Sequence, residues 1–534
     1  MASTVDDVVE ETPLLSSRAS STRKASSTTS SSSSSSSLQT GLASPVTPRK
    51  SATYIIALII AFILFISIGD ELIQPAQTRV VESIYCRQYY EKVNPGLVGG
   101  DGWVDERFCK ISKVQGQVAS LRALLLSLEG AGMLFLSVPW GYFADTYGRR
   151  PVFLLLTLGA WVKAAWIMVV LSFWKILPLE LVWLGALSIF IGGGSSVANA
   201  MIFTVISDVV PESGRVQVFF FIAAAGMSTQ FVGPFTSAML MVTNPWIPMF
   251  LGLALQLVPL FLYHRLPETL GYNAKPSIPP SSLSSSPSPS IHSTKRSRTE
   301  GVLEALQDSY TFVMSDRRLL LMFPAFFIQL ILMSRDVLMQ YISVRYQISL
   351  AKATVLISIR SGLILVLNLV LWPLLTWLFR TKWRFHPQKA DLLLSRSSVL
   401  IMSVGFLFIA LAPTLPLVVV AMIFNTFGWG LTLFLRSLLT SLVEGHHVAR
   451  LNSFLGIFDT TGLMVGSPLL ALAFEKGVEL GGVWIGLPFF GCAAVTGLIG
   501  FFLAFVGEVG LVNGDGSEVV VDVGDGDEEV GGRV

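Results

Sequence analysis

Long apolar runs, separated by short polar segments, fill most of this chain. A helix needs about 20 mostly apolar residues to cross the hydrocarbon core of a bilayer. Because lipid offers no partner for backbone N–H groups, each such run is predicted to be helical. Twelve runs satisfy this condition, at about 54–73, 118–143, 152–173, 179–206, 216–242, 246–263, 319–344, 355–379, 397–412, 416–442, 451–474 and 483–506. The pattern predicts an all-α membrane protein with about twelve spanning helices.

Polar segments divide these runs into two groups of six. We predict a disordered Ser-rich tail, a first six-helix bundle, a Ser/Pro-rich linker, a second six-helix bundle and an acidic disordered tail, over residues 1–52, 53–265, 266–317, 318–507 and 508–534. In the linker, the apolar spacing over 300–316 favours an amphipathic helix. Similar residues recur over 207–234 and 441–468, which indicates that the two halves are related.

Composition supports a membrane protein. The 534 residues are 52% hydrophobic and 13% charged, with a mean hydropathy of +0.65, whereas soluble proteins carry about 25% charged residues. A net charge of +2 gives no reason to expect a nucleic-acid partner.

Basic residues indicate the orientation in the membrane. The short loops on the side of both tails hold Arg149, Arg150, Arg215, Arg380, Lys382, Arg384, Lys389, Arg396 and Arg450, and the loops on the other side hold Lys175, Arg345, Lys352 and Lys476. The excess of positive charge places both tails and the linker in the cytosol.

A charged segment follows the second run and reads Gly141-Tyr-Phe-Ala-Asp145-Thr-Tyr-Gly148-Arg149-Arg150-Pro151. It resembles the loop signature of the major facilitator superfamily, G-x-x-x-D-x-x-G-R-[RK], in the position where that family carries it. The glycines permit a tight turn, and Asp145 is expected to face a helix N-terminus or an Arg across the two bundles. The resemblance implies the major facilitator fold, with two pseudo-symmetric six-helix bundles.

Two helices refine this resemblance. Helix five carries Gly226, Gly233 and Pro234, which resemble the Gly/Pro motif of drug-exporting members, although two later glycines of that motif are missing. Proton-coupled exporters often place an Arg in helix four, four residues before a Gly. Counting back from Gly192, that position is Ser188, so proton antiport is not implied by this motif.

The loop after the first run, about residues 74–117, contains Cys86 and Cys109. It resembles the corresponding loop of fungal facilitators tied to the export of small metabolites or toxins. In an oxidising compartment the two cysteines are expected to form a disulfide that staples this long loop. Two free thiols are the alternative.

Charged side chains inside apolar runs are costly in lipid, so each is a candidate for function or for a structural pair. Arg122 and Glu129 lie seven residues apart on one face of helix two. Glu129 is interpreted either as a proton-exchanging carboxylate or as the structural partner of Lys163 or a neighbouring Arg. Asp70 and Glu71, at the end of the first run, are expected to be solvated.

The second group of helices carries five further charges. An ion pair is predicted between Asp336 and Arg360, which would leave Arg335 to face the cavity. Arg436 and Asp459 are predicted to form a second pair, which we interpret as a latch within that bundle.

Neutral polar residues are the remaining candidates for the transport path: Asn199, Gln230, Gln329, Gln340 and Asn425. The sequence contains no metal-ligand spacing, phosphate-binding loop or nucleophile motif. We therefore expect no metal, no cofactor and no enzymatic activity, and ATP-driven transport is disfavoured.

Together these features predict a secondary active transporter that moves a small organic molecule by alternating access. Efflux of a metabolite or toxin, coupled to protons, is the first hypothesis. A proton-coupled nutrient importer is the alternative, and a non-transporting membrane sensor is the alternative from another class. We expect a monomer in the cell membrane, although residues 10–15 resemble an acidic dileucine signal that would favour a vacuolar or endosomal membrane.

Overall fold

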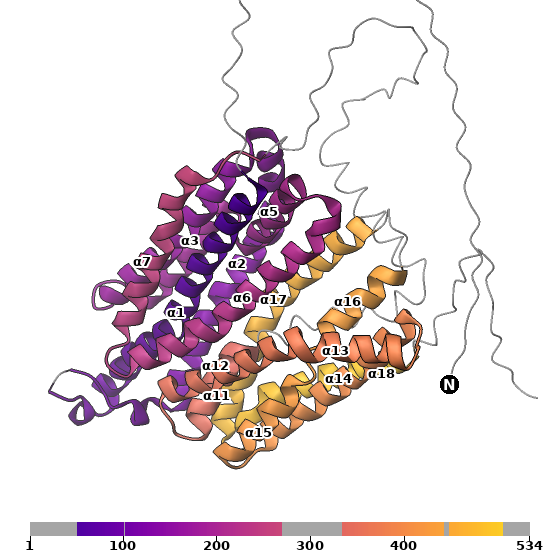
Figure 1. Cartoon of the computed structure of the whole chain (residues 1–534). Helices are drawn as coiled ribbons and strands as arrows, with labels where there is room; N and C mark the ends of the chain where they lie inside the picture. The colour runs from indigo at the N-terminus through magenta and orange to yellow at the C-terminus, as the bar shows by residue number, and fades with distance from the viewer. Residues whose placement is uncertain (1–50, 101, 270–333, 443–447, 506–534) are drawn as a thin grey trace, which may run out of the picture. The chain divides into compact units, whose positions relative to one another are not determined.

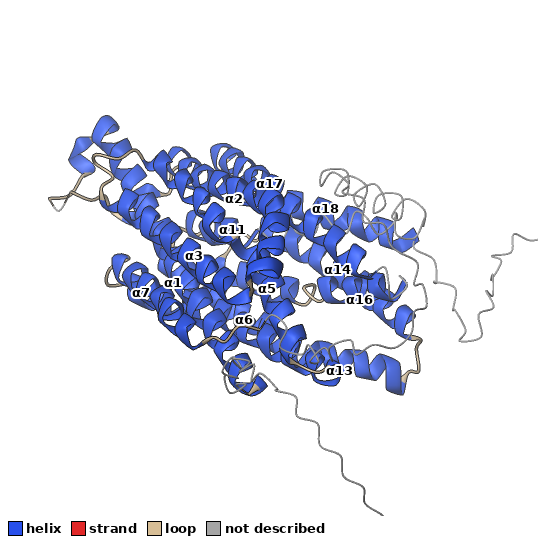
Figure 2. Ribbon diagram, turned by 90° about the horizontal axis from the view of Figure 1, so that it is seen from above, coloured by secondary structure: helices blue, strands red, loops and turns tan. Residues whose placement is uncertain are grey.

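A computed structural model describes residues 51–100, 102–269, 334–442 and 448–505, all within the unit that begins at Lys50. These residues form helices and connecting loops without any strand (Figures 1 and 2). Ten helical segments among them are long and apolar enough to cross a membrane. The predicted amphipathic helix over 300–316 and Gln329 lie outside the described residues.

The first group of helices, indigo to magenta in Figure 1, accounts for six expected spans. It consists of α1 (Ala52–Val93), α2 (Ser112–Tyr147), α3 (Arg149–Ser172), the consecutive η3, α4 and α5 (Leu179–Ser188, Ile189–Gly192 and Gly194–Val209), α6 (Glu212–Met241) and α7 (Trp246–Leu262). Three short 3₁₀ turns, η1 (Pro95–Leu97), η2 (Glu106–Cys109) and η4 (Tyr263–Arg265), lie between or after them.

The second group, orange to yellow in Figure 1, begins with the described part of the expected seventh span. It consists of α11 (Ser334–Arg345), α12 (Leu350–Val366) continued by η6 (Leu367–Leu371), α13 (Trp372–Trp377) and η7 (Leu378–Lys382), then α14 (Pro387–Leu411), α15 (Leu415–Thr426), α16 (Leu431–Leu442), α17 (Val448–Leu480), η9 (Gly482–Gly486) and α18 (Leu487–Phe505).

Two boundaries differ from the prediction because polar residues are paired inside the protein. Helix α1 ends at Val93 instead of about residue 73, and its buried Glu82 is satisfied by Lys110 and Gln115. Helix α14 begins at Pro387 instead of about residue 397, because buried Asp391 accepts hydrogen bonds from groups on neighbouring segments. A hydropathy pattern predicts that segments with charged residues such as Glu82 and Asp391 are loops.

Two spans are broken within the membrane. The fourth is interrupted at Gly193, between the end of α4 and the start of α5. Gly193 and Gly194 have φ angles of +77° and +75°, a conformation that favours glycine. The tenth is interrupted by residues 427–430, which separate α15 from α16. Irregular backbone at membrane depth is tolerated where protein covers it or where it lines a cavity.

Small residues allow helices of the two groups to approach closely. A Cβ on Gly130 of α2 would lie 3.3 Å from Met464 of α17, and a Cβ on Gly362 of α12 would lie 2.9 Å from Phe231 of α6. Close backbone approach of this kind is how helices associate in lipid. The α2–α17 and α6–α12 contacts therefore join the two groups.

We call the side where α1 begins and α18 ends the tail side. The other side, where α1, α11 and α17 end, is called the far side. The far-side ends of the two groups meet directly, because the backbone N–H of Leu350 at the start of α12 donates to Glu106 in η2 at 2.7 Å.

Candidate functional site

Two adjoining cavities lie among the helices of the first group. The first has a volume of about 270 Å³ and is lined mainly by α1, α3, α4 and α5, and the second has a volume of about 420 Å³ and is lined by α1, α5 and α6. Both cavities share Ile63, Ser67, Asp70, Asn199 and Ile202. The polar groups of α1 thus lie between the two spaces.

Asp70 is the carboxylate that both cavities share. Its Oδ1 accepts a hydrogen bond from Gln256 Nε2 of α7 at 2.8 Å, and among the described residues it forms no ion pair. Lys163, which also lines the first cavity, lies 3.3 Å from Glu129. Glu129 therefore has the structural partner that one interpretation predicted, whereas Asp70 has no cation at ion-pair distance among the described residues.

Two ion pairs join the groups of helices through neighbouring residues of α11. Arg335 donates to both oxygens of Glu71 on α1, at 2.9 and 2.5 Å, and Arg122 of α2 donates to Asp336 at 2.8 Å. Glu71 lies within α1 and is not a solvated group at its end. The two adjacent charges on α11 thus pair with opposite charges on two different helices of the first group, α1 and α2.

The predicted pair between Asp336 and Arg360 is wrong. Asp336 faces α2, where Arg122 neutralises it. Arg360 instead donates from Nη2 to Asn425 at 3.3 Å, and its guanidinium lies 4.8 Å from the centre of the Trp429 ring. Sequence depth alone placed Asp336 and Arg360 at one level but did not show which faces of their helices they occupy.

The remaining candidates fall into different environments. Arg436 and Asp459 form the expected ion pair at 2.7 Å, with both side chains well exposed. Asn199 and Gln230 line the second cavity, whereas Gln340 is buried beside the Arg122–Asp336 pair.

The Gly/Pro motif of the fifth span brings α6 onto α1 at the level of Glu71. A Cβ on Gly233 would clash with the Glu71 side chain, and Pro234 lines a small space together with Arg335. Gly226 lines the second cavity and has open space around it.

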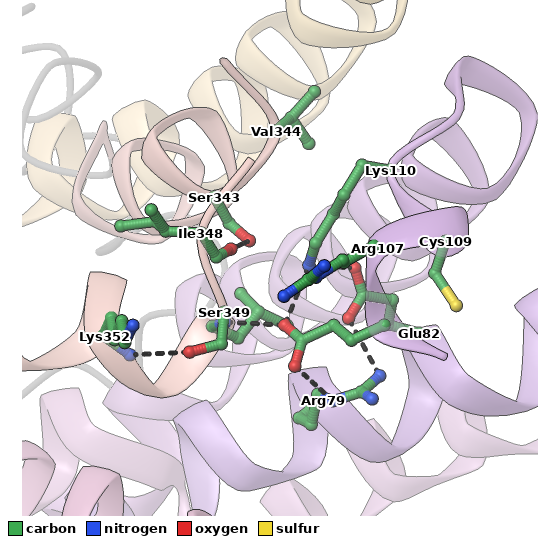
Figure 3. A network of polar contacts seen from close by, with 12 residues as sticks. Arg79, Glu82, Arg107, Cys109, Lys110, Ser343, Val344, Ile348, Ser349 and Lys352 are labelled. Carbon is green, nitrogen blue, oxygen red and sulfur yellow. Dashed lines mark hydrogen bonds and ion pairs between the residues drawn. The ribbon is translucent and has the colours of Figure 1, made fainter. Parts of the chain in front are cut away.

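A buried polar network holds the far-side loop in place (Figure 3). Glu82 of α1 accepts from Lys110 Nζ at 2.7 Å and from Gln115 Nε2 at 2.6 Å, and Arg79 bridges Glu82 and Glu106. Glu106 then accepts from the start of α12 in the second group. Carboxylates at a helix N-terminus satisfy free N–H groups and oppose the helix dipole favourably.

A disulfide between Cys86 and Cys109 ties this loop to α1. Cys109 is the last residue of η2, and Cys86 lies in α1 next to the buried core. The bridge therefore fixes the element that carries Glu106.

The tail-side loop at residues 141–151 is held by contacts within the first group. Asp145 pairs with Arg149 at 2.5 Å. Among the described residues its cation therefore lies within the loop, whereas one of the two alternatives was an Arg of the other group of helices. Arg149 also lies 3.5 Å from Asp208. Glu268 accepts from the backbone N–H groups of Arg149 and Arg150 at 2.8 and 3.1 Å and so caps α3.

We expect Gly148→Ala to lower the stability of the folded protein by about 2 kcal/mol, since a residue at positive φ is strained and a helix cap is displaced. Gly148 has φ +102°, and a Cβ there would clash with the Glu268 carboxylate. The measurement is the thermal unfolding midpoint of the purified protein. Gly141→Ala is the control, because a Cβ at Gly141 meets no atom within 4 Å. Equal midpoints for the two variants would contradict this role of Gly148.

A family model for the Major Facilitator Superfamily matches residues 112–467. The chain belongs to this superfamily. Its members act on small molecules within the membrane, so this protein is a transporter and not an enzyme.

Curated relatives and solved structures agree with this assignment. The chain is 32% identical over 469 residues to the MFS efflux pump atnC of Emericella nidulans, covering 86% of this chain and 90% of that one. It is 26% identical to the efflux pump ustT of Aspergillus flavus, covering 78% and 82%. A nucleoside transporter NupG mutant has a TM-score of 0.57 at 13% identity, covering 84% of this chain and all of that one. The xylose transporter XylE from E. coli, in a partially occluded inward-open conformation, has a TM-score of 0.54 at 14% identity, covering 86% of this chain and all of that one.

The sequence alone does not predict the environment or the partners of several residues of the site. The pattern predicts a solvated Asp70 and Glu71 because the first apolar run ends at about residue 73, and it gives no sign that Gln256 and Glu268 are partners in the fold. The adjacent acidic residues Asp70 and Glu71, inside an apolar run, are the signal in the sequence that could have identified them as partly buried groups.

Proposed function

We propose that this protein exports a small organic molecule by alternating access, driven by the exchange of protons. The observation that carries the proposal is the Glu71–Arg335 pair, which joins the two groups of helices beside the second cavity, whose wall contains both Glu71 and Asp70. Secondary transporters of this architecture bind substrate near the midplane and rock one bundle against the other.

The contacts between the two groups support a state that is closed on the far side. They include Glu106 with the start of α12, the Arg122–Asp336 pair and the packing of Gly116 against Glu475. Gly116, Glu475 and Glu106 lie near the far-side ends of their elements, whereas Arg122 and Asp336 lie deeper, with Asp336 near the start of α11. Substrate can leave on the far side only after these contacts separate, so we infer that they form the far-side gate.

The orientation of the chain in the membrane supports the proposed direction of transport. The positive charges of the short loops support a cytosolic tail side, from which substrate would enter the cavities. The relatives named efflux pumps support outward movement. We propose a monomer that resides in the cell membrane.

Asp70 is the proposed proton carrier. It accepts a neutral hydrogen bond from Gln256 and lies in the wall of both cavities, so its protonation would change the charge that the substrate meets. Glu129 is less suited to this role because Lys163 holds it as a pair.

Transport into everted membrane vesicles tests this function. With an acidified lumen, we expect at least one compound from a radiolabelled panel of aromatic acids, amines and neutral metabolites to accumulate, and accumulation to stop when the pH gradient is collapsed. Vesicles without the protein are the control. Accumulation only in right-side-out vesicles under an inward proton gradient would favour the importer instead, and uptake that survives a collapsed gradient would contradict proton coupling.

A further inference from the structure

Arg360 of α12 is a buried cation without a carboxylate. Its residue is 5% exposed, and within the part of the chain that the structure describes no acidic side chain lies at ion-pair distance from it. Its Nε has no hydrogen-bond partner. A guanidinium stays charged in proteins, so this site carries a positive charge that the described residues leave unbalanced.

Four other described cations within the spans are treated differently. Each of Arg122, Lys163, Arg335 and Arg436 has a carboxylate within 4 Å: Asp336, Glu129, Glu71 and Asp459, respectively. An unpaired buried charge is expensive, and intramembrane charges usually mark a functional site. What sets Arg360 apart is that it is buried and has an Nε without a hydrogen-bond partner, and packing does not explain this.

The surroundings of Arg360 are suited to a planar anion. The guanidinium lies over the Trp429 ring at 4.8 Å, and both Arg360 and Trp429 donate to the same Asn425 oxygen at the long distance of 3.3 Å. These contacts leave Nε, which is buried, without a hydrogen-bond partner. A guanidinium presents a planar fork that matches a carboxylate in two parallel hydrogen bonds.

Trp429 lies in the break between α15 and α16, at residues 427–430. A broken spanning helix places non-helical backbone and the N-terminus of its second half at membrane depth, where transporters often recognise anions. Trp429 is only partly buried.

Arg360 also lies close to the interface between the two groups of helices. Ile357, one helical turn before it, lines a small space together with Arg335, Asp336 and Pro234. This space borders the Glu71–Arg335 pair that we propose as part of the gate. Separation of the gate would therefore widen the approach to this face of α12.

We propose that Arg360 binds a carboxylate of the transported molecule and that the Trp429 ring stacks on the planar group next to that carboxylate. The proposal rests on the proposed function and names its substrate class as organic acids with a planar portion. Binding supplies the negative charge that Arg360 lacks in this structure.

Binding of a matched acid and amide tests the proposal. Tritiated indole-3-acetate and uncharged indole-3-acetamide are titrated into the purified full-length protein in lipid nanodiscs. We expect the wild type to bind the acid about 10-fold or more tightly than the amide, because hydrogen bonds to charged groups are the stronger ones. In Arg360→Gln the two affinities should become equal.

Arg436→Gln is the matched control, because it removes an arginine of the same group that has its own carboxylate. It should keep the preference for the acid. Trp429→Phe should weaken the binding of acid and amide together, since stacking does not depend on charge. A wild type that binds the acid no better than the amide, or an Arg360→Gln variant that keeps the preference, would overturn the proposal.

Thermal unfolding separates ligand binding from a purely structural role. Replacing an uncompensated buried charge by a neutral side chain is expected to leave the midpoint unchanged or to raise it. If Arg360 only supports the fold, Arg360→Gln should lower the midpoint and leave the ratio of affinities unchanged. Should that variant fail to fold, Arg360→Lys keeps the charge and loses the fork, and it should show a smaller acid preference than the wild type. An unchanged preference in that lysine variant would overturn the proposal.

The vesicle assay distinguishes a failure of the anion site from a failure of the proposed export function. Arg360-dependent binding of the acid without any transport into everted vesicles would leave the anion site standing and refute export. Transport of amines or neutral compounds without a preference for acids would support export and refute the anion site.

Discussion

Glu71→Gln should reduce transport into everted vesicles by roughly 100-fold. The substitution leaves Arg335 on the far-side gate without its bidentate partner. Removing one member of a buried pair costs about 3–5 kcal/mol, and we expect the lower end because the Arg335 side chain is 24% exposed. The closed far side becomes less stable, so the protein accumulates in the state that is open there and cycles slowly.

The control and the rescue make this result specific. Glu91→Gln removes a carboxylate from the same helix, but Glu91 pairs with Arg87 near the exposed far-side end of α1, and its loss should change flux less than twofold, as for other exposed pairs. The exchange Glu71→Arg with Arg335→Glu keeps the pair and should recover a substantial part of the flux. A double variant no better than Glu71→Gln would show that pairing between the two groups is not what matters.

Asp70→Asn is expected to abolish accumulation driven by a pH gradient. The amide retains the shape of the side chain and a contact with Gln256, but it cannot release a proton. Exchange of external for internal substrate, which needs no net proton movement, should continue at a rate similar to that of the wild type. The measurement compares both modes in the same vesicles.

Two variants serve as controls, one in the cavity wall and one at the neighbouring ion pair. Ser67→Ala alters a neighbouring residue that lines both cavities and should preserve the response to pH. Glu129→Gln should mainly lower stability, because it leaves Lys163 unpaired. Gradient-driven accumulation that persists in Asp70→Asn would remove Asp70 from the coupling mechanism.

The sequence predicted the architecture well because hydropathy over about 20 residues is a strong signal in lipid. It failed where polar residues are buried by other protein segments. The far half of α1, which contains Glu82, was assigned to a loop, because a single sequence does not show that Lys110 and Gln115 would return to neutralise it.

Side-chain pairing was harder to predict than helix position. Arg436 and Asp459 were matched correctly by depth. The same reasoning misassigned Asp336, because depth along a helix does not determine which neighbour a side chain faces. Arg335 and Asp336 are adjacent and point to different helices of the first group, which only the packing of α11 determines.

Crosslinking the far-side gate tests alternating access most directly. Position 116 on α2 and position 475 on α17 lie in contact, since a Cβ on Gly116 would be 2.8 Å from Glu475. The variant Gly116→Cys with Glu475→Cys can be oxidised to hold the two groups together, with each single variant as control. We predict that the oxidised protein loses transport, still binds ligand offered from the tail side, and regains transport on reduction. Undiminished transport by the fully crosslinked protein would contradict the account.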